Sequence, residues 1–215
     1  MSDVIVVGGG PAGSTVAALV AESGHRVQIF ERTAFPRFAI GESLMPDTYW
    51  TFERLGVLDK LNKSAFPRKH SVQFFGQSGR GSAPFYFSDN NPHESSVTWQ
   101  VQRAEFDQLL LDNAAEKGAE VHQNTRILEV LFDEASRDEE APRATGVRAK
   151  FADGEIREFD AQVVVDATGQ SALIGRKLKL SAPEPQLKKA SIYTHFAGGH
   201  RDEGIDEGAT LILHT

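Results

Sequence analysis

The sequence of 215 residues contains no cysteine, which excludes disulfide bonds, thiolate zinc sites, iron–sulfur clusters and a cysteine nucleophile. Any redox chemistry would therefore need an organic cofactor or a metal held by other ligands. Basic residues are outnumbered, with 23 Lys and Arg against 30 Asp and Glu, and the net charge of -7 argues against nucleic acid as a partner. No stretch approaches the roughly eighteen consecutive apolar residues that a membrane span requires.

The N-terminal stretch is apolar and rich in small residues, but it lacks the basic leader of a signal peptide and is interrupted by Gly8, Gly9, Gly10 and Pro11. We therefore expect a cytoplasmic protein without a membrane span. The histidines and acidic residues show no spacing typical of metal ligands, so no metal site is predicted. The length suits one or two ordinary globular domains.

A strand–helix–strand unit opens the chain. Val4 to Val7 is a short β-branched run typical of a buried parallel strand. Residues 12–23 carry apolar side chains at helical spacing, and Gly24 follows where a helix C-cap glycine belongs. Arg26 to Phe30 then predicts a second strand. Such a unit indicates an open parallel sheet with right-handed crossovers.

A weaker unit of the same kind follows, with a helix expected over 103–117 and a strand over 119–122. Turn residues separate the remaining strand-like runs, which suggests a β-meander over 127–159 and an antiparallel sheet inserted before residue 103. The remaining strands are expected at 71–77, 84–88, 96–102, 127–132, 145–151, 155–159, 162–166, 190–196 and 209–214. The fold class is therefore α/β, with a Rossmann-like parallel sheet, a β-meander and an inserted antiparallel sheet.

The glycines after the first strand form a phosphate-binding fingerprint. Gly8 would permit a tight turn, Gly10 would let the backbone approach a pyrophosphate, and Gly13 would allow close contact between helix and strand. Glu31 lies eighteen residues after Gly13 at the end of the second strand, where a carboxylate would accept hydrogen bonds from an adenosine ribose and disfavour NADP. The alternative is a glycine-rich turn with a surface glutamate.

Four segments extend this pattern: VVGGGPAGS at 6–14, Glu31-Arg32, VQRAEFD at 101–107 and VDATG at 165–169. Together they resemble the FAD-dependent monooxygenases, reductases and halogenases with the glutathione-reductase-like fold. The resemblance implies FAD as the cofactor and places Arg103 near its ribityl-pyrophosphate, whereas the residues alone also allow an exposed arginine at a helix start. The expected cofactor-binding residues are Gly8, Gly10, Pro11, Ala12, Gly13, Glu31, Arg32, Arg37, Glu42, Ser43, Arg103, Asp166 and Gly169.

Residues 35–46, FPRFAIGESLMP, resemble the Gly-Glu-Ser-x-x-Pro stretch of flavin-dependent halogenases and their reductase-like relatives. FPRKH at 66–70 resembles the place where halogenases carry their active-site lysine. The resemblance therefore makes Lys69 the catalytic candidate, with Lys60 and Lys63 as poorer matches. The alternative for Lys69 is a solvated lysine in a basic loop.

In that family, reduced flavin, oxygen and halide give hypohalous acid, which must be kept from water. A lysine would hold it by an ammonium hydrogen bond or as a haloamine, and the second route requires a neutral amine and so burial or a nearby cation. The implied partners are halide, a separate flavin reductase, and a small electron-rich aromatic substrate that is either free or bound to a carrier protein. A monooxygenase, a geranylgeranyl-reductase-like flavoprotein and a non-catalytic FAD-binding fragment remain alternatives.

The resemblance also suggests a domain division. Residues 1–70 and 100–180 are expected to form the FAD-binding domain, and 71–99 with 181–215 part of a substrate domain. Two motifs typical of the family, Trp-x-Trp-x-Ile-Pro and a later Gly-Asp segment, do not occur in the sequence. The expectation is therefore the N-terminal part of a longer protein, which alone would be inactive.

Overall fold

A computed structural model of the chain describes residues 2–136, 142–187, 189–199 and 201–214. It divides into two compact units, the first formed by Met1–Phe38 with Ala104–Gln186 and the second by Ala39–Arg103 with Leu187–Thr215. Within the described ranges, none of the helices combines the length and apolar character needed to cross a membrane.

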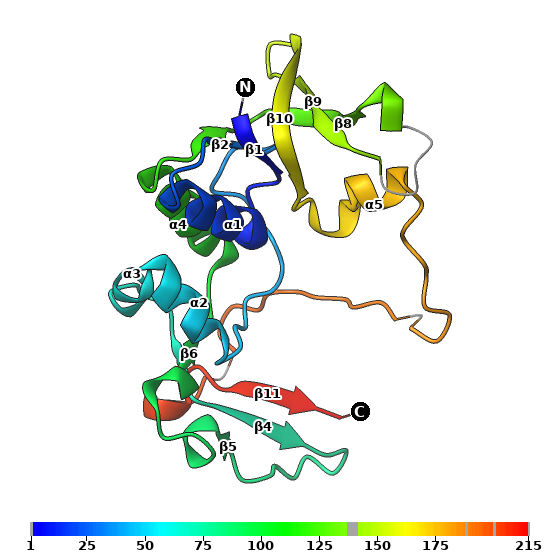
Figure 1. Ribbon diagram of the computed structural model, residues 1–215. Coiled ribbons are helices and arrows are strands. Elements are labelled where there is room, and N and C mark those ends of the chain that lie inside the picture. Colours follow the sequence, from blue (N-terminus) through cyan, green and yellow to red (C-terminus); the bar gives the residue numbers. More distant parts are fainter. Residues whose placement is uncertain (1, 137–141, 188, 200, 215) are drawn as a thin grey trace. The chain divides into compact units, whose positions relative to one another are not determined.

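The first unit alternates strands and helices before ending in a meander (Figure 1). The predicted opening unit is present, and Gly24 follows its helix with a positive φ of 88°. The elements of this unit are β1 (Ser2–Val7), α1 (Pro11–Glu22), β2 (Val27–Phe30), α4 (Arg103–Glu116), β7 (Glu120–His122), β8 (Arg126–Phe132), β9 (Ala144–Lys150), β10 (Ile156–Asp166) and α5 (Leu173–Lys177).

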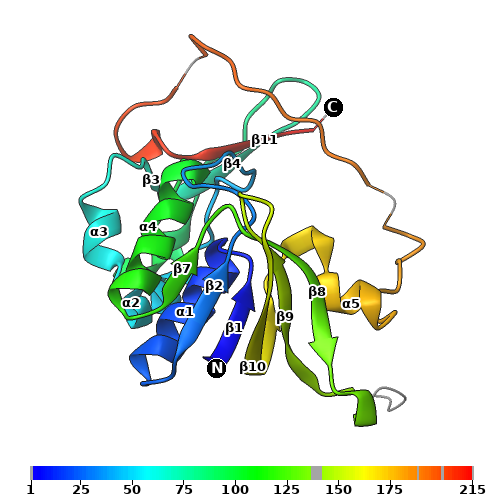
Figure 2. The same ribbon diagram turned by 90° about the horizontal axis from the view of Figure 1, so that it is seen from above.

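The strands of the first unit form one six-stranded sheet in the order β7-β2-β1-β10-β9-β8, which Figure 2 shows side by side. The pairs among β7, β2, β1 and β10 are parallel, and β9 pairs antiparallel with both β10 and β8. Since neighbouring parallel strands end at the same edge, the turns that follow β1, β2 and β10 meet there. The expected α/β fold class is confirmed.

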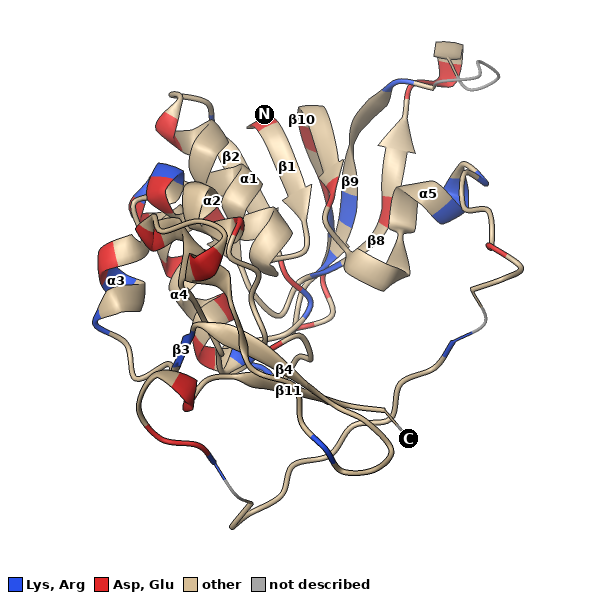
Figure 3. Cartoon of the chain, turned by 90° about the horizontal axis from the view of Figure 1, so that it is seen from below, with Lys and Arg blue, Asp and Glu red and all other residues tan. Residues whose placement is uncertain are grey.

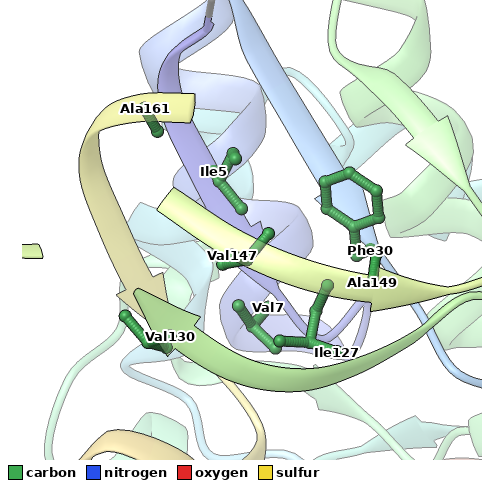
Figure 4. Close-up of a cluster of buried hydrophobic side chains, with 8 residues drawn as sticks. All are labelled: Ile5, Val7, Phe30, Ile127, Val130, Val147, Ala149 and Ala161. Atoms are coloured by element: carbon green, nitrogen blue, oxygen red, sulfur yellow. The ribbon is translucent and has the colours of Figure 1, made fainter. Parts of the chain in front are cut away.

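The core of this unit lies between the parallel strands and the meander (Figure 4). Ile5 and Val7 of β1 pack with Phe30 of β2 against Val130 of β8 and Val147 of β9, all buried. Burial of each such aliphatic side chain stabilises the fold by about 1.5–3 kcal/mol. Val6 points to the opposite face and is also fully buried, so the apolar run of β1 is buried on both faces of the sheet.

Strand β10 differs from its prediction. The separate strands expected at 155–159 and 162–166 are one continuous strand, Ile156–Asp166. Its first half pairs antiparallel with β9 and its second half parallel with β1, so one strand joins the meander to the parallel sheet. Arg148 of β9 forms ion pairs with Glu129 of β8 and Glu158 of β10, and Figure 3 shows the basic segment on β9 between acidic ones.

The second unit contains short helices and three short ladders. Strand β3 pairs antiparallel with β6, and β4 pairs antiparallel with β5, as expected for inserted sheet. However, β11 pairs parallel with β4. The elements of this unit are α2 (Thr48–Leu55), α3 (Leu58–Asn62), β3 (Arg68–Lys69), β4 (Ser71–Phe75), β5 (Phe85–Tyr86), β6 (Thr98–Trp99) and β11 (Thr210–Leu213).

The prediction of a strand over 190–196 is wrong, because this segment has no regular secondary structure and the side chains of Ile192 and Phe196 are exposed. Its alternation of apolar and polar residues indicated a strand, but it has no partner strand to complete a ladder within the described ranges. The acidic stretch 133–140 is described only to Ser136, and its remainder lies outside the described residues.

Three segments group differently from the expected domains, whose assignment stays a prediction: 181–186 lie in the first unit, and 100–103 and the long segment 39–70 lie in the second. For 39–70, the reason is hydrogen bonding to the strand before α4. Leu44 N donates to Trp99 O, Val101 N donates to Glu42 O, and Ser43 forms a bridge with Gln100. An isolated bridge and two backbone hydrogen bonds therefore join the Gly-Glu-Ser stretch to residues 99–101.

Candidate functional site

The turn between β1 and α1 is shaped by two glycines that no other residue could replace. Gly8 has a φ of 106°, and a Cβ there would lie 2.5 Å from Ala167 O. A Cβ on Gly13 would lie 1.9 Å from Gly8 O. The β1–α1 turn and the turn after β10 are therefore in backbone contact, as the fingerprint predicts for close packing of helix on strand.

Gly10 has a different role, because its φ of -69° and extended ψ are open to any residue. A Cβ there would meet only the Nη2 atom of Arg37, at 3.4 Å. Gly10 is the N-cap of α1 with no side-chain cap, and Pro11 occupies the first helical turn. The first-turn N–H groups have no intrahelical acceptor, so the helix N-terminus offers a partial positive charge to an anion.

Glu31 lies immediately after β2, and its side chain is buried despite its charge. Its Oε2 accepts a hydrogen bond from Gly9 N at 2.9 Å, and its Oε1 accepts from Thr33 N and Oγ1 at 3.1 and 2.9 Å. These bonds offset the cost of burying the carboxylate. The alternative of a surface glutamate is therefore wrong, and the residue is fixed beside the glycine turn.

Arg37 lies between two acidic side chains of the first unit. Its Nε lies 3.9 Å from Glu31 Oε1, and its Nη1 lies 3.4 Å from Asp107 Oδ2 on α4. Its guanidinium also stacks on the Phe35 ring, 4.6 Å from the ring centroid. Three groups thus fix one arginine next to Gly10.

Asp166 ends β10 and organises the turn that follows. Its Oδ1 accepts from Thr168 N and Oγ1, and its Oδ2 accepts from Ile174 N at 2.8 Å. Burial by itself would raise the pKa of Asp166, but these hydrogen bonds to the charged form outweigh it and the pKa lies below its ordinary value. Asp166 therefore holds the Ala167 backbone against Gly8.

The Gly-Glu-Ser stretch is part of the second unit. Glu42 Oε2 accepts from Gly41 N at 2.9 Å, and Arg103 Nη1 donates to the carbonyl of Ile40. A Cβ on Gly41, whose φ is 112°, would lie 2.9 Å from Arg103 Nη1. Arg103 is half-buried, so it is not a freely exposed arginine at a helix start.

Lys69 lies on the short strand β3, and its side chain is only 6% exposed. Its Nζ donates to Ser43 Oγ at 2.9 Å and to the carbonyl of Leu44 at 3.2 Å. The Phe87 ring centroid is 5.5 Å from the same nitrogen. Burial lowers the pKa of the Lys69 ammonium below its ordinary value. The alternative of a solvated lysine is wrong.

Thr210 of β11 completes the surroundings of Ser43. Thr210 Oγ1 lies 3.3 Å from Ser43 Oγ and accepts from Gln100 Nε2 at 3.0 Å. Lys69, Ser43 and Thr210 are far apart in the sequence and meet only in the folded second unit. These surroundings suit both protonation states of Lys69. Its ammonium form has a third N–H to donate, and its neutral form keeps a lone pair.

The remaining predicted residues have few contacts that indicate a role. Arg32 is exposed, as is Ala12 in the first turn of α1. Gly169 has a φ of 61°, and a Cβ there would meet no atom within 4 Å, so its conformation and not its surroundings favours glycine. The role of each predicted residue toward FAD stays a prediction.

The sequence reasoning missed three residues: Gly9 in the β1–α1 turn, Thr33 after β2 and Asp107 on α4. The Gly9 N–H and both donors of Thr33 satisfy Glu31. Asp107 is completely buried, and it belongs to the VQRAEFD segment that was singled out as a whole. Asp107 could have been identified from the sequence, because it lies one helical turn after Arg103 and next to apolar residues that are buried on α4.

Comparisons with known proteins agree with this geometry. Residues 1–209 match the family described as "FAD binding domain". The chain is 33% identical over 210 residues to a 1H-pyrrole-2-carbonyl-[peptidyl-carrier protein] chlorinase of Pseudomonas fluorescens, covering 90% of this chain and 45% of that protein. It is 32% identical over 206 residues to the flavin-dependent halogenase armH4 of Armillaria mellea, covering 93% and 38%.

Solved structures give the same result. The myxobacterial chondrochloren halogenase CndH superposes with a TM-score of 0.78 at 33% identity, over 99% of this chain and 47% of that one. A flavoprotein/dehydrogenase from Cytophaga hutchinsonii superposes with a TM-score of 0.76 at 34% identity, over 85% and 43%. The chain spans less than half the length of these relatives. With the fingerprint turn, the sheet and the family match in agreement, the chain belongs to the FAD binding domain family.

Proposed function

We propose that FAD binds the first unit with its diphosphate at the N-terminus of α1 and its adenosine ribose at Glu31. The open N-cap at Gly10 supports the first contact, because nothing but the tip of Arg37 occupies the space that a Cβ would fill. The fixed carboxylate of Glu31 supports the second, since its Oε2 accepts from Gly9 N and keeps a lone pair for a ribose hydroxyl, whereas Oε1 already accepts twice from Thr33. The residues present therefore fit the cofactor.

We further propose that the protein is a flavin-dependent halogenase. The observation that carries this proposal is the buried Lys69, held by two neutral oxygens from the Gly-Glu-Ser-Leu stretch. Two hydrogen bonds fix the direction of the Lys69 amine. If it is charged, its remaining N–H has a set direction, and if it is neutral, its lone pair has one. Both arrangements suit a group that holds an electrophilic halogen species, and its relatives are named as halogenases.

Reduced FAD, when bound, would supply two electrons and halide two more to dioxygen, and with one proton from solvent this would give FAD, water and hypohalous acid. Lys69 holds the hypohalous acid, either by an N–H donated to its oxygen or by an N–halogen bond formed with loss of water. The electron-rich ring carbon then takes the halogen and loses its proton. A separate flavin reductase would renew FADH2 from NADH.

The substrate class follows from chemistry and from two relatives. A halogen electrophile attacks electron-rich rings, such as phenols and pyrroles. Two relatives are named as a chlorinase and a brominase of a pyrrole carbonyl group held on a peptidyl carrier protein. We therefore propose a small electron-rich aromatic substrate, with a carrier-bound pyrrole as the first probe.

The test uses the protein expressed from its complete gene, with FAD, a flavin reductase, NADH, dioxygen and either chloride or bromide. Free phenol, free pyrrole-2-carboxylate and the same pyrrole on a carrier protein are offered separately, and products are identified by mass spectrometry. A product heavier by one halogen in place of one hydrogen is expected. A hydroxylated product, or no product with FAD bound, would contradict the halogenase proposal.

A second candidate is a flavin-dependent hydroxylase or reductase on the same scaffold. The similarity to a flavoprotein/dehydrogenase at 34% identity favours it as the alternative. In that case Lys69 would have no halide role, and omission of halide would leave turnover unchanged. The halide dependence of NADH-coupled product formation therefore separates the two candidates.

A further inference from the structure

The guanidinium of Arg37 directs its three nitrogens toward three different groups. Nε lies 3.9 Å from Glu31 Oε1, Nη1 lies 3.4 Å from Asp107 Oδ2, and Nη2 lies 3.4 Å from the position a Cβ would take on Gly10. All of these residues belong to the first unit. A planar guanidinium held at two of its nitrogens has little freedom to rotate, so the direction of the third nitrogen is determined.

The Nη2 end of the guanidinium lies beside a second group that carries positive charge. Nη2 faces the residue that caps the N-terminus of α1, and that end of a helix carries a partial positive charge. Two like charges therefore lie next to each other. An anion placed between the guanidinium and the helix N–H groups would interact favourably with both.

Asp107 is the group that keeps the arginine there. Its carboxylate is completely buried, whereas the side chain of Arg37 is 25% exposed. A buried carboxylate is costly unless it is paired, so Asp107 draws the guanidinium inward. Glu31 cannot do this alone, because it lies farther from the guanidinium and its oxygens already accept from Gly9 and Thr33.

We propose that Asp107 is a positioning residue for diphosphate recognition, acting through Arg37. It holds the guanidinium so that Nη2 faces the space in front of α1, where a nucleoside diphosphate such as the ADP part of FAD would be shared between arginine and helix. The inference rests on the proposed nucleotide site. It assigns Asp107 a role in selecting a diphosphate over the bare nucleoside.

The test compares Asp107→Asn with Asp112→Asn, the same substitution at an exposed position of the same helix. Dissociation constants for ADP and for adenosine are measured by competition with FAD on the protein expressed from its complete gene. The ratio of ADP affinity to adenosine affinity is expected to fall about tenfold in Asp107→Asn and to stay unchanged in Asp112→Asn. An unchanged ratio in Asp107→Asn would overturn the inference, because a general structural defect weakens both ligands.

A double-mutant cycle tests whether Asp107 acts through Arg37. In an Arg37→Gln background, adding Asp107→Asn is expected to leave ADP affinity unchanged, because the group it positions is gone. An equal loss in both backgrounds would show that Asp107 acts by another route. Arg37→Lys provides a variant that keeps the charge but not the fork, and it should lose the diphosphate preference while remaining folded.

The outcomes also separate this inference from the proposed function. A wild-type chain that binds neither FAD nor ADP contradicts the proposed nucleotide site itself. A wild-type chain that binds both, with a ratio insensitive to Asp107→Asn, contradicts only the inference. Halogenation plays no part in either readout.

Discussion

The glycine turn of the first unit and the lysine surroundings of the second unit represent two ways of building a site. The turn is made by backbone close to it in sequence, with Gly8, Gly10 and Gly13 spaced by a fixed pattern. The lysine is surrounded by side chains and carbonyls from segments far apart, including Ser43 and Phe87. A phosphate-binding turn is thus built from residues close together in the sequence, whereas the environment of a titratable side chain depends on the tertiary fold.

We predict that the side chain of Lys69 contributes more to the reaction than to folding. In Lys69→Met, halogenation is expected to fall at least about 100-fold, because no group remains to hold the halogen species. Stability should change little or rise, since an apolar side chain replaces a buried ammonium. Product yield by mass spectrometry and the thermal midpoint Tm are measured together, with the exposed Lys63→Met as the control. Undiminished halogenation by the Lys69→Met variant would contradict the role proposed for Lys69.

Gly13→Ala should do the opposite and damage the fold. The added Cβ would lie 1.9 Å from Gly8 O, so helix and strand must separate, and a loss of at least about 3 kcal/mol in the free energy of unfolding is expected. Gly24→Ala is the matched control, because its φ is 88° but no atom lies within 4 Å of the new Cβ. That variant should lose only about 1–2 kcal/mol. Equal losses in urea denaturation would show that space is not the constraint at Gly13.

Asp166→Asn tests the turn that contacts Gly8, and its effect depends on pH. Because the folded state lowers the pKa of Asp166, its stabilising contribution is complete above the ordinary value of 3.8 and is lost as the pH falls through the lower folded value. Asn cannot accept from both Thr168 and Ile174, so a loss of about 1–3 kcal/mol is expected at pH 7. The difference between the two proteins in urea denaturation should shrink as the pH falls. A difference that is constant with pH would assign the effect to something other than the charge.

Gly10→Ala should have the smallest effect on stability and should act mainly on FAD binding. Its extended backbone suits alanine, but alanine is a poorer N-cap than glycine, so the free energy of unfolding should fall by about 0.5–1 kcal/mol. FAD affinity should nevertheless fall about tenfold, because the methyl group enters the space in front of α1. A titration of flavin fluorescence measures this. An unchanged affinity would show that the diphosphate does not bind in front of α1.

Several structural features could be predicted because their causes are local. The apolar run at Val4 to Val7 predicted β1, and helical spacing followed by Gly24 predicted α1. The glycine fingerprint requires a strand before it and a helix after it, and both are present. The family resemblance carried the choice of FAD, since the same residues serve NAD.

Other features could not be predicted because they depend on pairing between distant segments. The merging of 155–159 and 162–166 into β10 requires β9 on one side and β1 on the other. The segment 190–196 alternates like a strand but has no partner strand among the residues that the structure describes, so its pattern gave a wrong prediction. Residues 39–70 group with the second unit through bonds to 98–101, which no periodicity reveals.

The sequence by itself determined the absence of thiol chemistry, the acidic balance and the nucleotide-binding turn, because composition and short-range backbone geometry are properties of neighbouring residues. Only the tertiary structure decided that Lys69 is buried and that Asp107 and Glu31 both face Arg37. Burial and charge pairing are set by groups that arrive from elsewhere in the chain. The acidity of an amine and the direction of a guanidinium depend on those groups, and for that reason the chemistry of both sites becomes visible only in the folded protein.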